Sequence, residues 1–183
     1  MTYVISDIHG NYNQFEKMLK KIKFNSSDKM YILGDVIDRG TEPIRLLKKI
    51  SQMENVFLVI GNHEVMMLNA YAKKPNAYGL WYMNGGEVTD EQFEQLEPDE
   101  QDKLLGYLMS SYLVIPNLVV NNRHFYLTHS THLSRPIKTP VMYKDNGENR
   151  PEVLRYRGSS DGWHAPRVLS GNRQIYHRSN PFR

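Results

Sequence analysis

Residues 30–40 read MYILGDVIDRG, an apolar run that ends in a glycine, two carboxylates and an arginine. The run from Met30 to Leu33 predicts a buried strand. Thr41 and Pro43 then provide an N-cap and a first-turn proline for a helix that carries apolar side chains at helical spacing. This part of the chain therefore predicts a strand, a polar loop and a helix in succession.

The same order occurs on both sides of this stretch. Residues 2–6 and 56–60 form apolar or β-branched runs, and helical patterns follow from Phe15 to Ile22 and from Val65 to Ala70. Three strand-loop-helix units in the first 73 residues predict a parallel sheet with helices packed on it. Ligands bind beyond the carboxyl ends of the strands in such sheets, and polar clusters follow all three strands.

The pattern changes after residue 70. Residues 71–111 predict helices without strands, including a capping box at Thr89 and Gln92, and we interpret them as a small helical cap. Short apolar runs between residues 113 and 128 surround Asn121 and Asn122, which predicts antiparallel strands that end at His129. Prolines interrupt the periodicity of the remaining residues, for which we predict no element.

Composition limits the function classes. With 183 residues, 40% of them hydrophobic, the chain is expected to form a single domain over residues 1–183. Cysteine is absent, so His, Asp, Glu or Asn must hold any metal. The apolar runs are far below the roughly 20 residues of a membrane span, and a polar motif begins at once, which excludes a signal peptide; we expect a cytoplasmic protein without membrane contact. Lysine and arginine are scattered, so the net charge of +3 predicts no nucleic-acid partner.

Three polar clusters carry the chemistry, and their sequences are DIHG at residues 7–10, GDVIDRG at residues 34–40 and GNHE at residues 61–64. An aspartate and a histidine two residues apart can point at one cation, although this pair alone is weak support. Arg39 can grip phosphate oxygens through two parallel hydrogen bonds. Any one of these residues is more often an ordinary polar strand end, but together they favour a shared site.

The clusters resemble the blocks Gly-Asp-x-His-Gly, Gly-Asp-x-x-Asp-Arg-Gly and Gly-Asn-His-Glu of the calcineurin-like metallophosphoesterase superfamily, in its bacterial serine/threonine protein phosphatase branch. Ser6 replaces the first glycine. Residues 81–86, WYMNGG, with Thr89 after them, resemble the cap of bacterial members, and the resemblance covers residues 1–135. It implies an α/β fold, a metallophosphoesterase-type sandwich of two mixed sheets flanked by helices, with a small helical cap. Trp81 and Tyr82 are predicted to pack in the core or cap and not to stack on a substrate.

The resemblance also implies roles for individual residues. Two divalent metal ions, manganese before iron or zinc, would be held with Asp35 as the bridge. His63 would be the general acid, oriented by Asp38, and Arg39 would neutralise charge on the phosphoryl oxygens. The implied ligands are Asp7, His9 and Asp35 for one metal, and Asp35, Asn62 and His129 for the other.

Two expected blocks are altered or missing near the end of the chain. A second arginine is expected in a Trp-x-Arg block, and Arg157 is the nearest match. A further histidine ligand is expected in a Gly-His-Thr block, which this sequence lacks; His177 is the preferred candidate and His164 the other. Either the chain is cut short or the second metal site is rewired.

We interpret the sequence as a metal-dependent phosphomonoesterase, with phosphoserine or phosphothreonine protein phosphatase as the main hypothesis. The expected partner is a phosphorylated protein or a small phosphoester. A dinucleoside polyphosphate hydrolase, which shares these blocks, is the alternative among enzymes. A degenerate phosphatase fold that acts as a binding module is the alternative outside enzymes, and the missing block is its main support.

Overall fold

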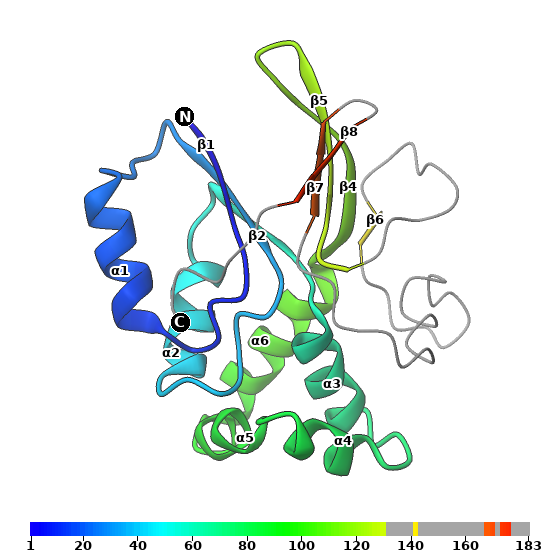
Figure 1. Ribbon diagram of the computed structural model, residues 1–183. Helices are drawn as coiled ribbons and strands as arrows, with labels where there is room; N and C mark the ends of the chain where they lie inside the picture. The colour runs from blue at the N-terminus through cyan, green and yellow to red at the C-terminus, as the bar shows by residue number, and fades with distance from the viewer. Residues whose placement is uncertain (131–140, 143–166, 171–172, 177–183) are drawn as a thin grey trace.

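The computed structural model describes residues 1–130, 141–142, 167–170 and 173–176. Strands β1, β2 and β3 alternate with helices α1, α2 and α3 and pair in parallel in chain order (Figure 1). The three predicted strand-loop-helix units are therefore confirmed. Their bounds are β1 Thr2–Ile5, α1 Tyr12–Lys21, β2 Lys29–Leu33, α2 Pro43–Ser51, β3 Val56–Val59 and α3 Asn62–Tyr71.

Two helices begin at residues that differ from the prediction. Helix α2 has Pro43 in its first turn, as expected, but Glu42 and not Thr41 is its N-cap. Helix α3 begins at Asn62, so the third polar cluster lies in the first helical turn and not in a loop. The reason is the Glu64 carboxylate, which accepts a hydrogen bond from the backbone N–H of Gly61, three residues earlier, and so caps the helix.

Residues 71–111 contain the helices α4 (Ala77–Met83), α5 (Glu87–Phe93) and α6 (Pro98–Ser110), with no strand between them. Figure 1 shows α4 and α5 at one end of the molecule, beyond the loops that follow β1 and β2. The prediction of a capping box at Thr89 and Gln92 is wrong. Thr89 lies inside α5, and its hydroxyl contacts Asp38. A hydrogen bond to a distant part of the chain has replaced the local one.

The predicted antiparallel strands form a hairpin of β4 (Tyr112–Val120) and β5 (Arg123–Thr128). Asn121 and Asn122 form its turn with φ of 49° and 61°, which suits a two-residue hairpin turn. Val59 of β3 pairs in parallel with Tyr112 of β4. The hairpin therefore continues the parallel sheet.

Three short strands complete the described part of the sheet, namely β6 (Val141–Met142), β7 (Arg167–Ser170) and β8 (Arg173–Tyr176). The order is β1-β2-β3-β4-β5-β7-β8, with β6 paired to β4. The α/β fold class is confirmed. The two mixed sheets of the prediction are joined at β3 and β4, because the two strands pair there, so that a parallel half and an antiparallel half form one curled sheet.

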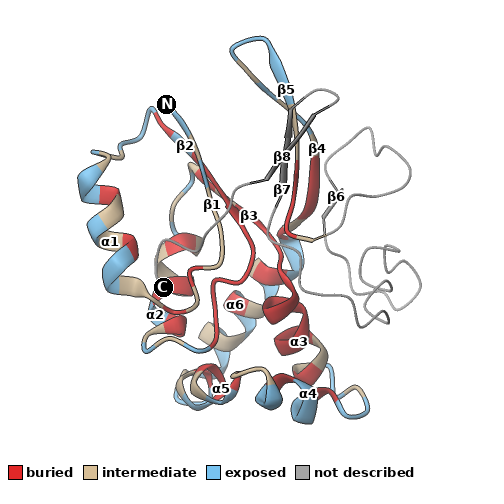
Figure 2. Cartoon of the chain, in the orientation of Figure 1, coloured by how far each residue is buried: buried red, intermediate tan, exposed pale blue. Residues whose placement is uncertain are grey.

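The core lies on both faces of the sheet, because successive strand residues point to opposite sides. Met30 and Ile32 pack with the helices, while Tyr31 and Leu33 pack with apolar residues of the hairpin. Figure 2 shows that β2, β3 and α3 are mostly buried. The loops that carry the polar clusters are therefore attached to the most buried strands and helix.

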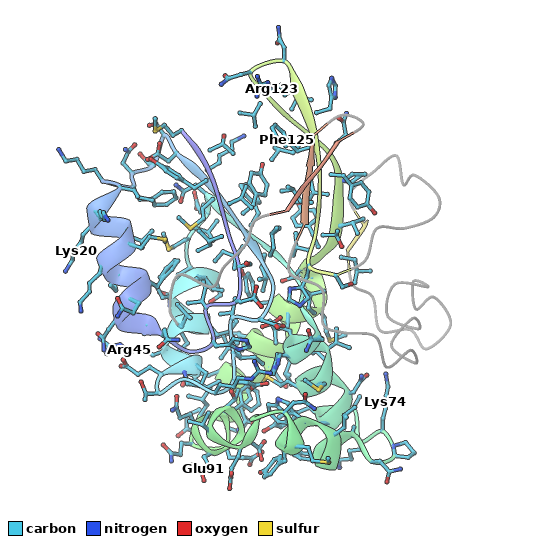
Figure 3. All side chains as sticks on the ribbon, in the orientation of Figure 1. Lys20, Arg45, Lys74, Glu91, Arg123 and Phe125 are labelled. Carbon is cyan, nitrogen blue, oxygen red and sulfur yellow. The ribbon has the colours of Figure 1, made fainter. Side chains whose placement is uncertain are left out.

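The described surface carries dispersed positive charge. Figure 3 shows Lys20 on α1 and Arg123 near the tip of the hairpin, at separate places on the molecule.

Among the described residues, no helix is both long enough and apolar enough to cross a bilayer.

Candidate functional site

The loops after β1 and β2 run side by side beyond the ends of the strands. The backbone N–H of Asp7 donates to the Gly34 carbonyl at 3.1 Å, and the N–H of His9 donates to the Asp35 carbonyl at 2.9 Å. These bonds extend the parallel pairing past the sheet. Asp7, His9 and Asp35 are therefore held at the same edge by the backbone alone.

Five residues of these loops other than glycine have left-handed backbones, a conformation that ordinary side chains rarely adopt. Each costs about 1–3 kcal/mol and persists only where the surroundings hold it, and such strain gathers at functional sites. The angles φ are 53° for Asp7, 47° for His9, 54° for Asp35, 70° for Asp38 and 65° for Arg39. All five are residues that the sequence placed in the site.

Glu64 ties the loop after β2 to helix α3. Its buried carboxylate accepts hydrogen bonds from the backbone N–H groups of Asp35 at 2.9 Å, Val36 at 2.7 Å, Ile37 at 3.3 Å and Gly61 at 2.7 Å. Burial and the neighbouring Asp35 carboxylate raise the pKa of Glu64, while the hydrogen bonds to backbone N–H groups oppose this. Sequence reasoning missed this role, although the three-residue spacing from Gly61 is a capping-box signal.

The same junction requires glycine at position 61, because a side chain would not fit there. A Cβ atom there would overlap the Asp35 carboxylate and the backbone N of Asp35. The close approach of α3 to Asp35 therefore depends on glycine at this position.

Three histidines direct their Nε2 atoms toward the Asp35 carboxylate. Nε2 of His129 lies 3.4 Å from Oδ1, and Nε2 of His9 and His63 lie 3.8 Å and 4.0 Å from Oδ2. The Nδ1 atoms of His9 and His129 contact the carbonyl oxygens of Ile37 at 3.0 Å and Leu33 at 2.7 Å. Because a carbonyl only accepts, both Nδ1 atoms carry the proton, and a neutral ring presents its Nε2 lone pair to Asp35.

The protonation of these two rings follows from their surroundings. Burial lowers the pKa of His9, although the Ile37 carbonyl and the Asp35 charge act in the opposite direction. Burial acts to lower the pKa of His129 as well, but the Asp35 charge and the Leu33 carbonyl outweigh it, and the pKa is raised. The Asp35 charge therefore favours a positive charge on the His129 ring.

The residues around Asp35 fit a metal centre. The Nε2 atom of His129 lies 2.9 Å from Oδ1 of Asn62, a separation that suits two ligands of one cation as well as a hydrogen bond from a protonated ring. Ligand atoms of His9, Asp35 and His63 lie within 4.8 Å of one another. Ligands about 2.0–2.2 Å from a transition metal lie about 3–4 Å apart, and imidazole, carboxylate and amide oxygens suit manganese, iron or zinc.

The close group of His9, Asp35 and His63 differs from the expected set of ligands. Asp7 is near enough for its charge to raise the pKa of His129, but the group of ligand atoms around His9 and Asp35 includes His63 and not Asp7. Both metal binding and proton donation by His63 would use the same Nε2 atom. His164, His177 and Arg157 lie outside the described residues.

Asp38 is fully buried and surrounded by hydrogen-bond donors. Its Oδ2 accepts from His63 Nδ1 at 2.6 Å and from Trp81 Nε1 at 2.9 Å, and its Oδ1 accepts from the Thr89 hydroxyl at 2.6 Å. The contact with His63 places a carboxylate behind the ring, in the position that the family resemblance implied. Trp81 is buried, as predicted, but its contact with Asp38 and that of Thr89 were not foreseen. Their place in the WYMNGG stretch and just after it was the only signal.

Arg39 lies at the exposed edge of the site. One guanidinium nitrogen, Nη1, lies 3.2 Å from Nε2 of His9, and Nε donates to the Asn84 carbonyl at 3.4 Å. The positive charge therefore lies beside the histidines, where an anionic group bound near Asp35 would meet it. Its fork of N–H donors matches phosphate oxygens.

One known protein family has a model that matches most of this chain. The model of the family described as calcineurin-like phosphoesterase matches residues 2–174. A protein of Wigglesworthia glossinidia brevipalpis named symmetrical bis(5'-nucleosyl)-tetraphosphatase is 45% identical over 73 residues, which cover 39% of this chain and 27% of that protein. A protein of the same name from Erwinia tasmaniensis is 30% identical over 115 residues, which cover 62% of this chain and 39% of the relative.

These matches are partial in length. The matched part spans less than two fifths of either relative. A solved structure of a cold-active protein tyrosine phosphatase is 22% identical with a TM-score of 0.39, covering 62% of this chain and 39% of the other. A likeness at that level carries no argument about function.

Proposed function

Because the chain belongs to the calcineurin-like phosphoesterase family, we propose that it hydrolyses phosphoesters with divalent metal ions held around Asp35. The proposed ligands are Asp7, His9, Asp35, Asn62 and His129, with His177 as a further candidate. The proposed catalytic residues are His63, Asp38 and Arg39, with Arg157 as a further candidate. Bound divalent metals supply Lewis acidity and an acidified water at such a centre, and manganese is our first choice.

The pairing of His63 with Asp38 carries the proposal. The His63 ring is fully buried, its Nδ1 contacts the Asp38 carboxylate at 2.6 Å, and its Nε2 faces Asp35. A carboxylate that accepts from Nδ1 fixes the orientation and the tautomer of the ring. His63 can then give the proton on Nε2 to the leaving-group oxygen, a role that contributes roughly 10²–10⁴-fold in rate.

Arg39 and the loop backbones account for phosphate binding and for the placement of the acid pair beside the guanidinium. Arg39 can bind two phosphoryl oxygens while its Nε remains tied to the Asn84 carbonyl. The strained backbones of Asp38 and Arg39 keep the acid pair and the guanidinium adjacent. A phosphoester held between Asp35 and Arg39 would thus lie within reach of His63.

Symmetrical dinucleoside tetraphosphates are the substrate class that we favour. The relatives from Wigglesworthia and Erwinia bear that activity in their names. Dephosphorylation of phosphoserine or phosphothreonine in proteins is the second candidate. It is favoured by residues 81–89, which resemble the cap of bacterial protein phosphatases and contact Asp38.

The test compares turnover of an aryl phosphate by the wild-type chain with added manganese and by Asp35→Asn and His63→Asn. Both variants should lose at least about 100-fold in rate. His124→Asn, which changes an exposed histidine of β5, should retain wild-type activity. Equal rates in all four proteins would overturn the proposed hydrolase and favour a binding module.

The substrate class is tested with the same proteins. We expect a higher kcat/KM for a symmetrical dinucleoside tetraphosphate than for a phosphothreonine peptide, with two nucleoside diphosphates as products. A higher value for the peptide would select the second candidate.

A further inference from the structure

Asp38 and Arg39 are held by one short segment of the helical region. Both residues are left-handed, with φ of 70° and 65°, so two successive strained residues need support from outside their own loop. That support comes from residues 81–89, which span the end of α4, the turn after it and the start of α5. We call residues 81–89 the clamp segment.

The clamp segment contacts both the backbone and the side chains of this pair. The N–H of Arg39 donates to the Gly85 carbonyl at 3.1 Å, and Nε of Arg39 donates to the Asn84 carbonyl at 3.4 Å. The backbone N–H of Asp38 donates to the Thr89 hydroxyl oxygen at 3.0 Å, and the same hydroxyl donates to Asp38 Oδ1. Thr89 therefore fixes both ends of Asp38.

Trp81 completes the support of the Asp38 carboxylate. Its ring is fully buried, and its N–H shares Oδ2 of Asp38 with His63. A Cβ atom on Gly86 would overlap the Trp81 ring, so glycine at that position lets the backbone lie against the ring. The donors from Trp81 and Thr89 fix the plane of the carboxylate.

The consequence reaches His63. The carboxylate can hold the ring in one orientation and tautomer only if it stays in that plane. Among the described residues, neither Trp81 nor Thr89 contacts Asp35 or the histidines around it. Each therefore acts through Asp38. As the bond between phosphorus and the leaving oxygen breaks, the proton on His63 Nε2 moves to that oxygen, while the Nδ1 proton remains shared with Asp38.

We propose that Trp81 and Thr89 are positioning residues that hold Asp38, and through it His63, in the geometry of a proton donor. This inference rests on the proposed function, because it assigns the two residues a role in protonating the leaving group. The same role predicts how firmly the His63 ring is hydrogen-bonded to Asp38, which can be measured without turnover.

Leaving-group dependence separates this role from a purely structural one. Thr89→Val removes the hydroxyl at similar volume, and Trp81→Phe removes the indole N–H together with part of the ring. With phenyl phosphate, whose leaving group needs a proton, kcat should fall about 10–100-fold. With 2,4-dinitrophenyl phosphate, whose leaving group departs as an anion, kcat should fall less than about 3-fold, and KM should change little for either substrate.

Two matched variants serve as controls. Thr89→Ser keeps the hydroxyl and should restore most of the rate with phenyl phosphate. Tyr82→Phe, which removes a hydroxyl that donates to Asp90 on the neighbouring helix, should leave both rates unchanged. An equal loss with both substrates in Trp81→Phe and Thr89→Val would overturn the positioning role.

Proton NMR provides the readout that needs no turnover. The Nδ1 proton of His63, assigned by its loss in His63→Asn, should exchange with water at least about tenfold faster in Trp81→Phe and Thr89→Val, because the hydrogen bond to Asp38 is less well held. Unchanged exchange in both variants would overturn the inference whatever the activity. A wild-type chain that turns over neither ester would instead refute the proposed function, and the NMR result would still decide the positioning of His63.

Discussion

Glu64 joins two parts of the site through a single carboxylate. Its oxygens accept from backbone N–H groups of Gly61 on one side and of Asp35, Val36 and Ile37 on the other. Hydrogen bonds to a charged group contribute about 1.5–3 kcal/mol each, and a buried donor left without an acceptor costs about as much. The position of Asp35 therefore depends on a residue that does not itself face the histidines.

Glu64→Gln tests this dependence. The amide NH₂ group would face backbone N–H groups, so we expect the free energy of unfolding in urea to fall by about 2–4 kcal/mol. Glu91→Gln is the matched control, because Glu91 lies exposed on α5 (Figure 3), and it should change the free energy by less than about 0.5 kcal/mol. Similar unfolding curves for Glu64→Gln and the control would contradict the structural role of Glu64.

At the same scale, short spacing decided which site residues the sequence could reveal. Asp35, Asp38 and Arg39 stand within five residues of one another, and His63 follows Asn62 directly, so their motifs are visible in the sequence. Trp81 and Thr89 lie 43 and 51 residues from Asp38 and meet it only after folding. Nothing local distinguishes them from a core aromatic residue and a helix cap.

The strands β1–β3 and the helices α1–α3 could be predicted because their sequences have clear local periodicity. Each strand is a short apolar run before a polar loop, and each helix repeats apolar residues at helical spacing. The strands β6, β7 and β8 could not be predicted, since prolines interrupt that part of the sequence. Their pairing also depends on partner strands elsewhere in the chain.

Helix α6 offers a prediction about an element that does not contribute to the site. Gly106 lies in its interior on the exposed side, and a Cβ atom there would meet no other atom within 4 Å. Gly106→Ala should therefore raise the free energy of unfolding by about 0.5–1 kcal/mol through helix propensity alone.

The measurement is the midpoint of urea unfolding, with the dependence of the free energy on urea concentration unchanged. Gly61→Ala, whose Cβ would overlap Asp35, should shift the midpoint in the opposite direction. A midpoint for Gly106→Ala below that of the wild-type chain would show that α6 is strained at this residue.

At the scale of the molecule, the site is assembled from distant segments. His9 follows β1, Asp35 follows β2, Asn62 begins α3 and His129 follows β5. An unfolded chain cannot bring these four residues together, so metal binding should be coupled to folding.

Manganese should therefore stabilise the whole chain. At about 100 times its dissociation constant, the free energy of unfolding should rise by about 2.7 kcal/mol, which corresponds to about 5–10 °C in Tm for a chain of this size. Asp35→Asn and His129→Gln should abolish the increase, and His124→Gln should preserve it. Calorimetry with manganese and after treatment with a chelator measures the effect, and an equal increase in Asp35→Asn would place the metal elsewhere.

The hydrogen bond from His129 to the Leu33 carbonyl joins residues that are 96 positions apart. During synthesis, β1, β2 and β3 with their helices leave the ribosome well before the hairpin that brings His129 to this carbonyl. The nascent chain thus holds an incomplete set of the proposed ligands until β5 has emerged. If these residues bind metal as proposed, the order of synthesis delays high-affinity metal capture until most of the fold is in place.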